Sequence, residues 1–216
     1  MTEASMTAGP WDRPLGKLIV RTVICVLVAA GLAIFAGGPT WGAVGPAIGF
    51  MAGSFLTGLL TGQVLGRSAD PERRVGVVMV VHLALQELIR VGLVLWSGMS
   101  AVDAAWIGLL TWSVVLPLGL LGLRRLSTVE RGPEERPEPA LGPVSVLVSG
   151  GVIAKAMAPW LLVVWSPPLV LLTFAVQAGA GLLERGTERK QVFSAAAGYL
   201  LMALALALWL SPMGQV

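Results

Sequence analysis

Polar side chains that could take part in chemistry interrupt an apolar stretch between residues 75 and 96. His82, Gln86 and Arg90 recur every four residues, so a helix would place them on one face. Glu87 lies three residues before Arg90, which is the spacing of an ion pair along a helix. Charged groups in an apolar span are costly and mark candidate functional sites.

Two further polar residues interrupt other apolar stretches at a similar depth. Lys155 lies as far from the start of its stretch, at Pro143, as Glu87 lies from Val75. At about 1.5 Å per residue, both lie roughly 18 Å along their helices. Gln177 reaches a comparable level on a stretch that runs the opposite way. We therefore predict one buried polar layer, made of His82, Gln86, Glu87, Arg90, Lys155 and Gln177.

This polar layer has two interpretations. A buried ion-pair network could fix the register of the helices without doing chemistry. Alternatively, the surplus positive charge could attract an anionic substrate or a lipid headgroup. His82 could then relay protons, because histidine titrates near neutral pH. The chain has one histidine and one cysteine, too few for a zinc or haem site, so we expect no metal and no cofactor.

Composition places these residues in a membrane protein. The chain has 216 residues, of which 56% are hydrophobic and 12% are charged, and its mean hydropathy is +0.81. A soluble domain carries about 25% charged residues. These values exclude a soluble globular domain and a disordered chain, and a net charge of +3 gives no basic face for nucleic acid. We predict a single all-α membrane domain over residues 1–216, with the lipid bilayer as its first partner.

Seven stretches are apolar enough to cross a bilayer, which takes about 20 residues. They are Leu18–Ala36, Gly42–Leu65, Val75–Trp96, Ala104–Leu123, Pro143–Trp165, Pro168–Leu183 and Val192–Leu210. Around them we predict a polar N-terminal tail at 1–16 and a charged, proline-rich cytoplasmic loop at 126–141. A cleaved signal peptide at the first stretch is the alternative, and it would leave six helices.

The charges in the loops predict how the chain is oriented across the membrane. Every basic residue outside the spans falls on one side of a seven-helix arrangement: Arg13, Lys17, Arg67, Arg73, Arg74, Arg124, Arg125, Arg131, Arg136, Arg185, Arg189 and Lys190. The positive-inside rule makes that side, and the N-terminus, cytoplasmic. Five tryptophans lie near the opposite ends, where aromatic rings favour the interface: Trp41, Trp96, Trp106, Trp165 and Trp209. Compact loops favour the inner or plasma membrane of a prokaryote.

The second stretch carries glycines at spacings of four. Two series share this spacing, and they are offset from each other by roughly 100° around the helix: Gly45, Gly49 and Gly53, then Gly58, Gly62 and Gly66. Small residues on one stripe let another helix approach closely in a membrane. The stripe could pack inside the bundle, form an interface with a membrane-protein partner or a second copy, or belong to a gating helix.

The third stretch carries a family resemblance. The sequence Arg67-Ser68-Ala69-Asp70, followed by Gln86-Glu87-Leu88-Ile89-Arg90, resembles the anterior-pharynx-defective subunit of gamma-secretase. That subunit is a seven-helix scaffold related to the type II CAAX and PrsW-type proteases. The resemblance implies that Gln86, Glu87 and Arg90 occupy a former active-site position. Gln86 replaces the first glutamate of those proteases and no histidine follows His82, so the resemblance implies a non-catalytic relative.

Three functions follow, in order of preference. The first is a non-catalytic scaffold or accessory subunit, with close-packed helices and a structural polar layer. The second is a small-solute transporter or channel whose site is Glu87, Arg90 and Lys155. The third is an intramembrane protease-like enzyme, which is least favoured because a glutamate-activated water would need a second carboxylate or a histidine.

Overall fold

A computed structural model describes the backbone of residues 14–65, 71–126, 143–184 and 188–211. Within it, the side chains of residues 21–63, 76–113, 146–180 and 192–211 are described. Every described element is a helix, and this part of the chain contains no strand. The predicted all-α class is therefore confirmed. The tail at 1–16 and the loop at 126–141 lie outside the described residues, apart from 14–16, which begin the first helix, and residue 126, which ends the fourth.

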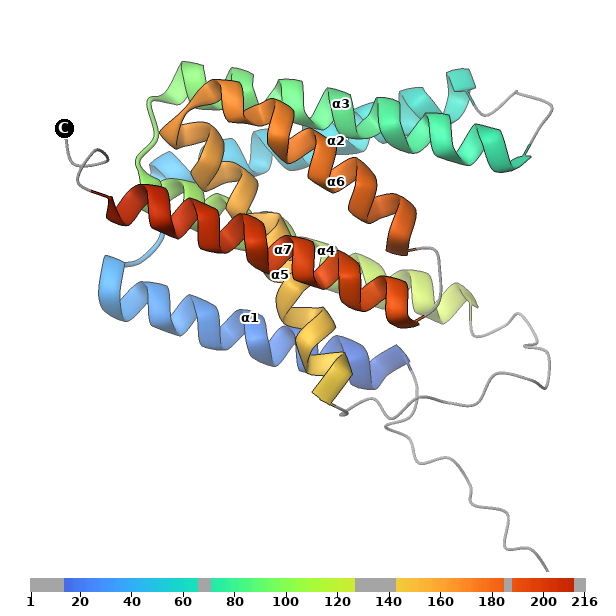
Figure 1. The fold of residues 1–216 in the computed structure, drawn as a ribbon, viewed down its shortest axis with the longest axis horizontal. Coiled ribbons are helices and arrows are strands. Elements are labelled where there is room, and N and C mark those ends of the chain that lie inside the picture. Colours follow the sequence, from blue (N-terminus) through green and yellow to red (C-terminus); the bar gives the residue numbers. More distant parts are fainter. Residues whose placement is uncertain (1–13, 66–70, 127–142, 185–187, 212–216) are drawn as a thin grey trace, which may run out of the picture.

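Seven α-helices and one short 3-10 helix make up the fold (Figure 1). They are α1 Pro14–Ala36, α2 Trp41–Leu65, α3 Pro71–Ser97, α4 Ala101–Leu126, α5 Pro143–Trp165, η1 Pro167–Leu169, α6 Val170–Glu184 and α7 Glu188–Leu210. The seven predicted helices are all present. Helices α1, α3 and α7 begin earlier than predicted, because hydrogen bonding along the backbone continues through polar residues that hydropathy excludes.

Four of the described helices, α2, α3, α5 and α7, are long and apolar enough to cross a membrane. The described apolar parts of α1 and α6 are shorter. Large apolar side chains stay exposed on the outside of the bundle, including Phe35, Leu88 and Leu171. Exposed apolar surface on this scale is typical of a protein that is covered by lipid or by a partner.

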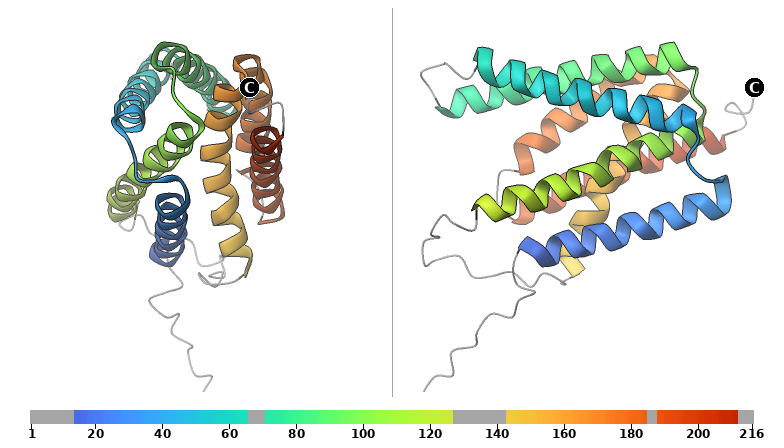
Figure 2. Two further views of the ribbon diagram at one scale, coloured as in Figure 1. Left: turned by 90° about the vertical axis from the view of Figure 1, so that its left-hand side faces the viewer. Right: turned by 180° about the vertical axis from the view of Figure 1, so that it is seen from behind.

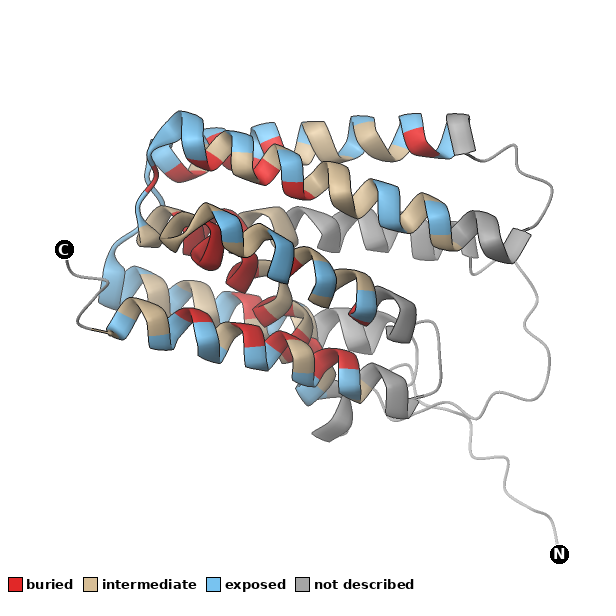
Figure 3. Cartoon of the chain, turned by 45° about the horizontal axis from the view of Figure 1, so that its top comes forward, coloured by how far each residue is buried: buried red, intermediate tan, exposed pale blue. Residues whose placement is uncertain are grey.

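Helix α5 lies within an arc formed by the other helices. Neighbouring helices contact one another in the order α1, α4, α2, α3, α6 and α7, and α5 contacts α1, α3, α4, α6 and α7. Figure 2 shows α5 between the pair α6 and α7 and the arc formed by the remaining helices. Helix α5 is mostly buried, and the described parts of the helices around it are mostly exposed or half-buried (Figure 3).

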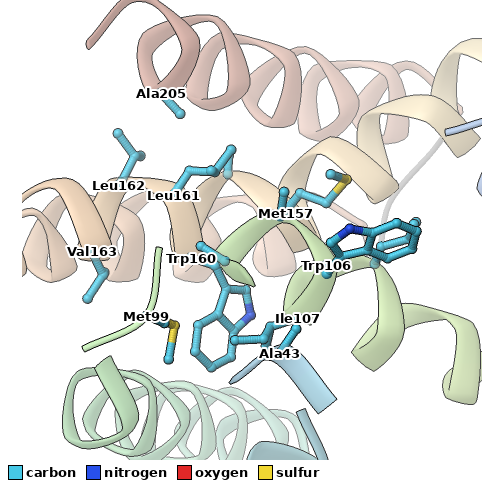
Figure 4. Close-up of a cluster of buried hydrophobic side chains, with 14 of the residues drawn as sticks. Ala43, Met99, Trp106, Ile107, Met157, Trp160, Leu161, Leu162, Val163 and Ala205 are labelled. Atoms are coloured by element: carbon cyan, nitrogen blue, oxygen red, sulfur yellow. The ribbon is translucent and has the colours of Figure 1, made fainter. Parts of the chain in front are cut away.

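The core is built around the C-terminal half of α5. Trp160, Leu162 and Val163 are almost completely buried. Figure 4 shows Trp160 next to Ile107 of α4 and Ala43 of α2. Burying a side chain as large as tryptophan fixes the distance between three helices, so this cluster sets the spacing of the bundle.

Glycines of α4, α5 and α7 produce the closest helix contacts. A Cβ atom on Gly151 of α5 would lie 2.5 Å from Ala195 Cα, and one on Gly198 of α7 would lie 2.2 Å from the Gly151 carbonyl oxygen. A Cβ atom on Gly108 of α4 would lie 2.6 Å from Met157 Cα. Backbone atoms cannot move aside, so any side chain at these positions would separate the helices.

The glycines of α2 divide by position along the helix. The central three, Gly49, Gly53 and Gly58, face Leu93, Ile89 and His82 of α3. Gly45 and Gly62 face no described atom within 4 Å, and Gly66 lies outside the described residues. The stripe therefore packs against α3 only in the middle of the helix, and its contacts are with side chains.

A capping box begins α4 and attaches it to the start of α2. The Asp103 backbone N–H donates to Ser100 Oγ at 3.2 Å, and the Ser100 N–H donates to Asp103 Oδ2 at 3.1 Å. Thr40, just before α2, donates to the other carboxylate oxygen of Asp103. Trp106 donates to the carbonyl of Gly37, which follows α1, at 3.0 Å. This end of α4 thus holds the connection between α1 and α2.

We predict that Asp103 stabilises the fold above pH 4 and loses this effect in acid. Partial burial raises the pKa of Asp103, but hydrogen bonds from Thr40 and Ser100 outweigh burial and leave the pKa below its ordinary value. A lowered pKa in the folded state stabilises the charged form, so stability falls as pH drops through that pKa. The melting temperature in detergent should fall from pH 7 to pH 3 more steeply for wild type than for Asp103→Asn.

Asp103→Ala should lower stability by about 1 kcal/mol at pH 7, as loss of a helix cap does. Thr40→Val is the matched control, because it removes the contact to α2 and keeps the capping box. Equal acid sensitivity in wild type and Asp103→Asn would contradict the role given to this carboxylate.

Candidate functional site

A cavity of about 250 Å³ lies between α2, α3, α4, α5 and α6. Four of the six residues predicted to share a polar layer line it: Gln86, Arg90, Lys155 and Gln177. Aromatic rings form much of the rest of the wall, from Phe50, Trp112 and Trp160. An apolar wall with a few polar groups is typical of a small-molecule site.

The residues that line the cavity differ in how far they are buried. Phe50, Arg90 and Trp160 are buried. Val152 and Lys155, nearer the N-terminal end of α5, are half-buried. The lining is therefore more buried around Phe50, Arg90 and Trp160 than around Val152 and Lys155.

Arg90 lies in the most buried part of the cavity lining. Its Nη1 donates to Glu87 Oε1 within α3. The guanidinium also lies 5.3 Å from the Phe50 ring centre and 5.1 Å from the Trp160 ring centre. Arginine over an aromatic face gains cation–π energy, most of all where water is excluded. The charge of Arg90 is thus balanced by one carboxylate and two rings.

Glu87 is a structural counterion for Arg90. It is 3% exposed and is not among the residues that line the cavity. Its Oε2 accepts a hydrogen bond of 3.1 Å from Thr173 of α6, which is completely buried. Both carboxylate oxygens therefore have a donor.

Lys155 lies at the less buried part of the cavity lining, apart from Glu87. It donates to Ser194 Oγ of α7 at 3.4 Å, which is long for a hydrogen bond. The predicted polar layer therefore contains two units, the pair of Glu87 with Arg90 on α3 and the amine of Lys155 on α5. Pro159 cannot donate a hydrogen bond to the Lys155 carbonyl four residues earlier.

Two buried N–H groups on lining residues have no hydrogen-bond partner within the described part of the chain. They are Nε of Arg90 and Nε1 of Trp112. A buried donor without an acceptor costs about 1–3 kcal/mol. Any bound acceptor that reaches these groups recovers that free energy. The described lining residues supply amine, guanidinium, amide, hydroxyl and indole groups, and no carboxylate.

His82 lies beside the cavity, between α2 and α3. Its Nε2 is 3.0 Å from Gln86 Nε2, and its Nδ1 is 3.2 Å from Thr57 Oγ1. Thr57 in turn donates to the Ser54 carbonyl at 3.0 Å. Gln86 therefore touches both the histidine and the cavity, and it connects the two.

Sequence reasoning missed the residues contributed by other helices. Thr173, Phe50 and Trp160 all contact the Glu87–Arg90 pair, and none has a spacing that links it to α3. Pro159 was a local signal near Trp160, since a proline inside an apolar helix marks a special position. The described residues hold no group of three His, Cys, Asp or Glu side chains able to bind a metal ion.

The geometry defines a helical bundle with an internal cavity that carries positive charge and is lined by aromatic rings. No family model, curated protein or solved structure matches the chain. The resemblance of α3 to the gamma-secretase subunit therefore stays a prediction.

We predict that Glu87 and Arg90 stabilise the bundle only as a pair. Removing one partner of a buried ion pair destabilises a protein by about 3–5 kcal/mol, whereas apolar replacement of both is often neutral. Glu87→Leu should therefore lower the folded yield and the melting temperature, and Glu87→Leu with Arg90→Met should restore both in part. Thr173→Val is the milder control, with an expected loss of about 1–2 kcal/mol. A neutral Glu87→Leu variant would refute the pairing.

Proposed function

We propose that the protein spans the membrane seven times, with its N-terminus in the cytoplasm of a prokaryotic cell. The seven helices, the exposed apolar side chains and the basic loops support this arrangement. In this orientation, the N-terminal ends of α3 and α5 face the cytoplasm. The less buried part of the cavity lining, at Val152 and Lys155, then lies on the cytoplasmic side of Trp160.

The cavity binds a small anionic solute, and the protein acts as its carrier. The observation that supports this most strongly is the lining of the cavity, which contains the Lys155 amine and no described carboxylate. It also contains Arg90 Nε and Trp112 Nε1, two buried donors that have no hydrogen-bond partner within the described part of the chain. Carriers place their substrate site near the middle of the bilayer, between helices that are interrupted or bent. Helix α5 contains Pro159 at this level, where one backbone hydrogen bond of the helix cannot form.

The size and walls of the cavity limit the solute. An apolar cavity of about 150 Å³ in another protein accepts benzene. A cavity of about 250 Å³ therefore has room for a ring or a short aliphatic body with one charged group. Phe50, Trp112 and Trp160 would contact the apolar body, and Lys155 would contact the charge. Benzoate is a suitable first probe.

A scaffold is the second candidate, and the Glu87–Arg90–Thr173 contacts favour it. Glu87 and Thr173 are buried and do not line the cavity, and their contacts join α3 to α6, as a structural ion pair would. If the resemblance to the gamma-secretase subunit reflects common descent, this pair is the structural remainder of an active site. Such a role is compatible with a carrier, since a bundle with a cavity also needs fixed helices.

We predict that Lys155→Met weakens benzoate binding by about tenfold or more. Hydrogen bonds to charged groups contribute about 1.5–3 kcal/mol, and 1.4 kcal/mol is a factor of ten. Quenching of tryptophan fluorescence in the purified protein measures binding, and uptake into proteoliposomes measures transport. Neutral benzamide should bind at least tenfold more weakly than benzoate.

Two variants make this test specific. Lys155→Arg keeps the charge and should keep binding, whereas Ala156→Leu fills the cavity without changing charge and should abolish it. All three variants should melt within a few degrees of wild type. Benzoate and benzamide binding equally, or binding unaffected by Lys155→Met and Ala156→Leu, would exclude this site.

A further inference from the structure

The hydrogen bonds around His82 determine which ring nitrogen carries the proton. Thr57 donates its hydroxyl hydrogen to the Ser54 carbonyl, so its oxygen is left to accept from His82 Nδ1–H. Gln86 presents its amide nitrogen, which only donates, so His82 Nε2 must accept. With the Gln86 amide placed in this way, each contact has one donor and one acceptor when the ring is neutral and its proton is on Nδ1.

A second proton on His82 would break only one of these contacts. In the cation both ring nitrogens donate. The bond from Nδ1 to Thr57 is retained, but Nε2–H would meet the amide hydrogens of Gln86. The conflict is removed when the Gln86 amide turns over, so that its oxygen accepts from Nε2. The amide nitrogen then takes the position away from His82.

This rotation changes the cavity, because Gln86 is also a lining residue. The rotation replaces the acceptor that the side chain presents away from His82 with an N–H donor. An anion gains from a donor and is repelled by an acceptor. The positive charge on His82 adds a smaller attraction of the same sign.

We infer that the cavity is proton-coupled: protonation of His82 turns the Gln86 amide and so increases the affinity for an anion. This inference rests on the proposed anion site. Because linkage is reciprocal, a bound anion must favour protonation of His82 by the same factor. The cavity would then take up a proton together with its anion, which is the chemistry of a proton–anion symporter.

The described charged side chains on the helices around His82 have partners other than His82. Helix α3 packs against α2, α5 and α6. Among described side chains, α2 and α6 contribute no charged group, α5 contributes Lys155, and α3 itself contributes Glu87 and Arg90. Glu87 is paired with Arg90, and Lys155 donates to Ser194, so none of these contacts uses an atom of His82.

The test uses the fact that His82 is the single histidine in the chain. The full-length protein is labelled at histidine, purified with a tag that lacks histidine, and titrated by NMR between pH 5 and 8. Saturating benzoate, which is anionic over this range, should raise the titration midpoint by about one pH unit. Benzoate should also bind about tenfold more tightly at pH 5.5 than at pH 8, because a hydrogen bond to a charged group is at stake.

Two variants locate the coupling. His82→Gln lies outside the cavity and should bind benzoate with the same affinity at both pH values. Gln86→Leu keeps the histidine, and benzoate should then leave its titration midpoint almost unchanged. Both results are ratios within one variant, so a change in absolute affinity does not affect them.

The outcomes separate this inference from the proposed function. If wild type binds benzoate equally at both pH values, the coupling is wrong and the anion site stands. If coupling persists in Gln86→Leu, the Gln86 relay is wrong. If wild type binds no benzoate at any pH, the proposed function fails, and this inference fails with it. Where a variant does not fold, the wild-type titration with and without benzoate decides.

Discussion

The structure depends on how the charge of Arg90 is accommodated inside the bundle. An isolated cation in an apolar interior is costly, so it needs a counterion and polarisable neighbours. Glu87 supplies the first from α3, and the rings of Phe50 and Trp160 supply the second from α2 and α5. Thr173 satisfies the other oxygen of Glu87 from α6. Four helices therefore meet at one charge, and their relative rotations are fixed by it.

Close packing on the other side of α5 keeps the central helix in place. Gly151 and Gly198 bring the backbones of α5 and α7 together, and Gly108 does the same for α4. Toward α2 and α3 the neighbours of α5 are large side chains, which hold the helices apart. The difference between small residues on one side and aromatic residues on the other leaves the cavity between α5 and the helices α2, α3, α4 and α6.

Local spacing predicted what lies within one helix. The i,i+3 pair of Glu87 with Arg90 and the i,i+4 contact of His82 with Gln86 follow from helix geometry, and both are present. Depth along the chain also placed Lys155 and Gln177 near the layer. The rotation of each helix is not encoded locally. The contacts of Thr173 and Trp160 with the Glu87–Arg90 pair therefore could not be predicted from the sequence. The glycine spacing indicated close helix packing at α2, but the closest backbone approaches lie at Gly108, Gly151 and Gly198.

The predicted polar layer thus contains two positively charged side chains, Arg90 and Lys155, that have different surroundings. The guanidinium of Arg90 contacts a buried carboxylate and two aromatic rings, and its Nε has no hydrogen-bond partner among the described residues. Lys155, on α5, lines a cavity whose described walls offer it no carboxylate. Lys155 donates to Ser194 of α7 and also lines the cavity. The same side chain thus takes part in helix packing and, in the function proposed above, contacts the anion.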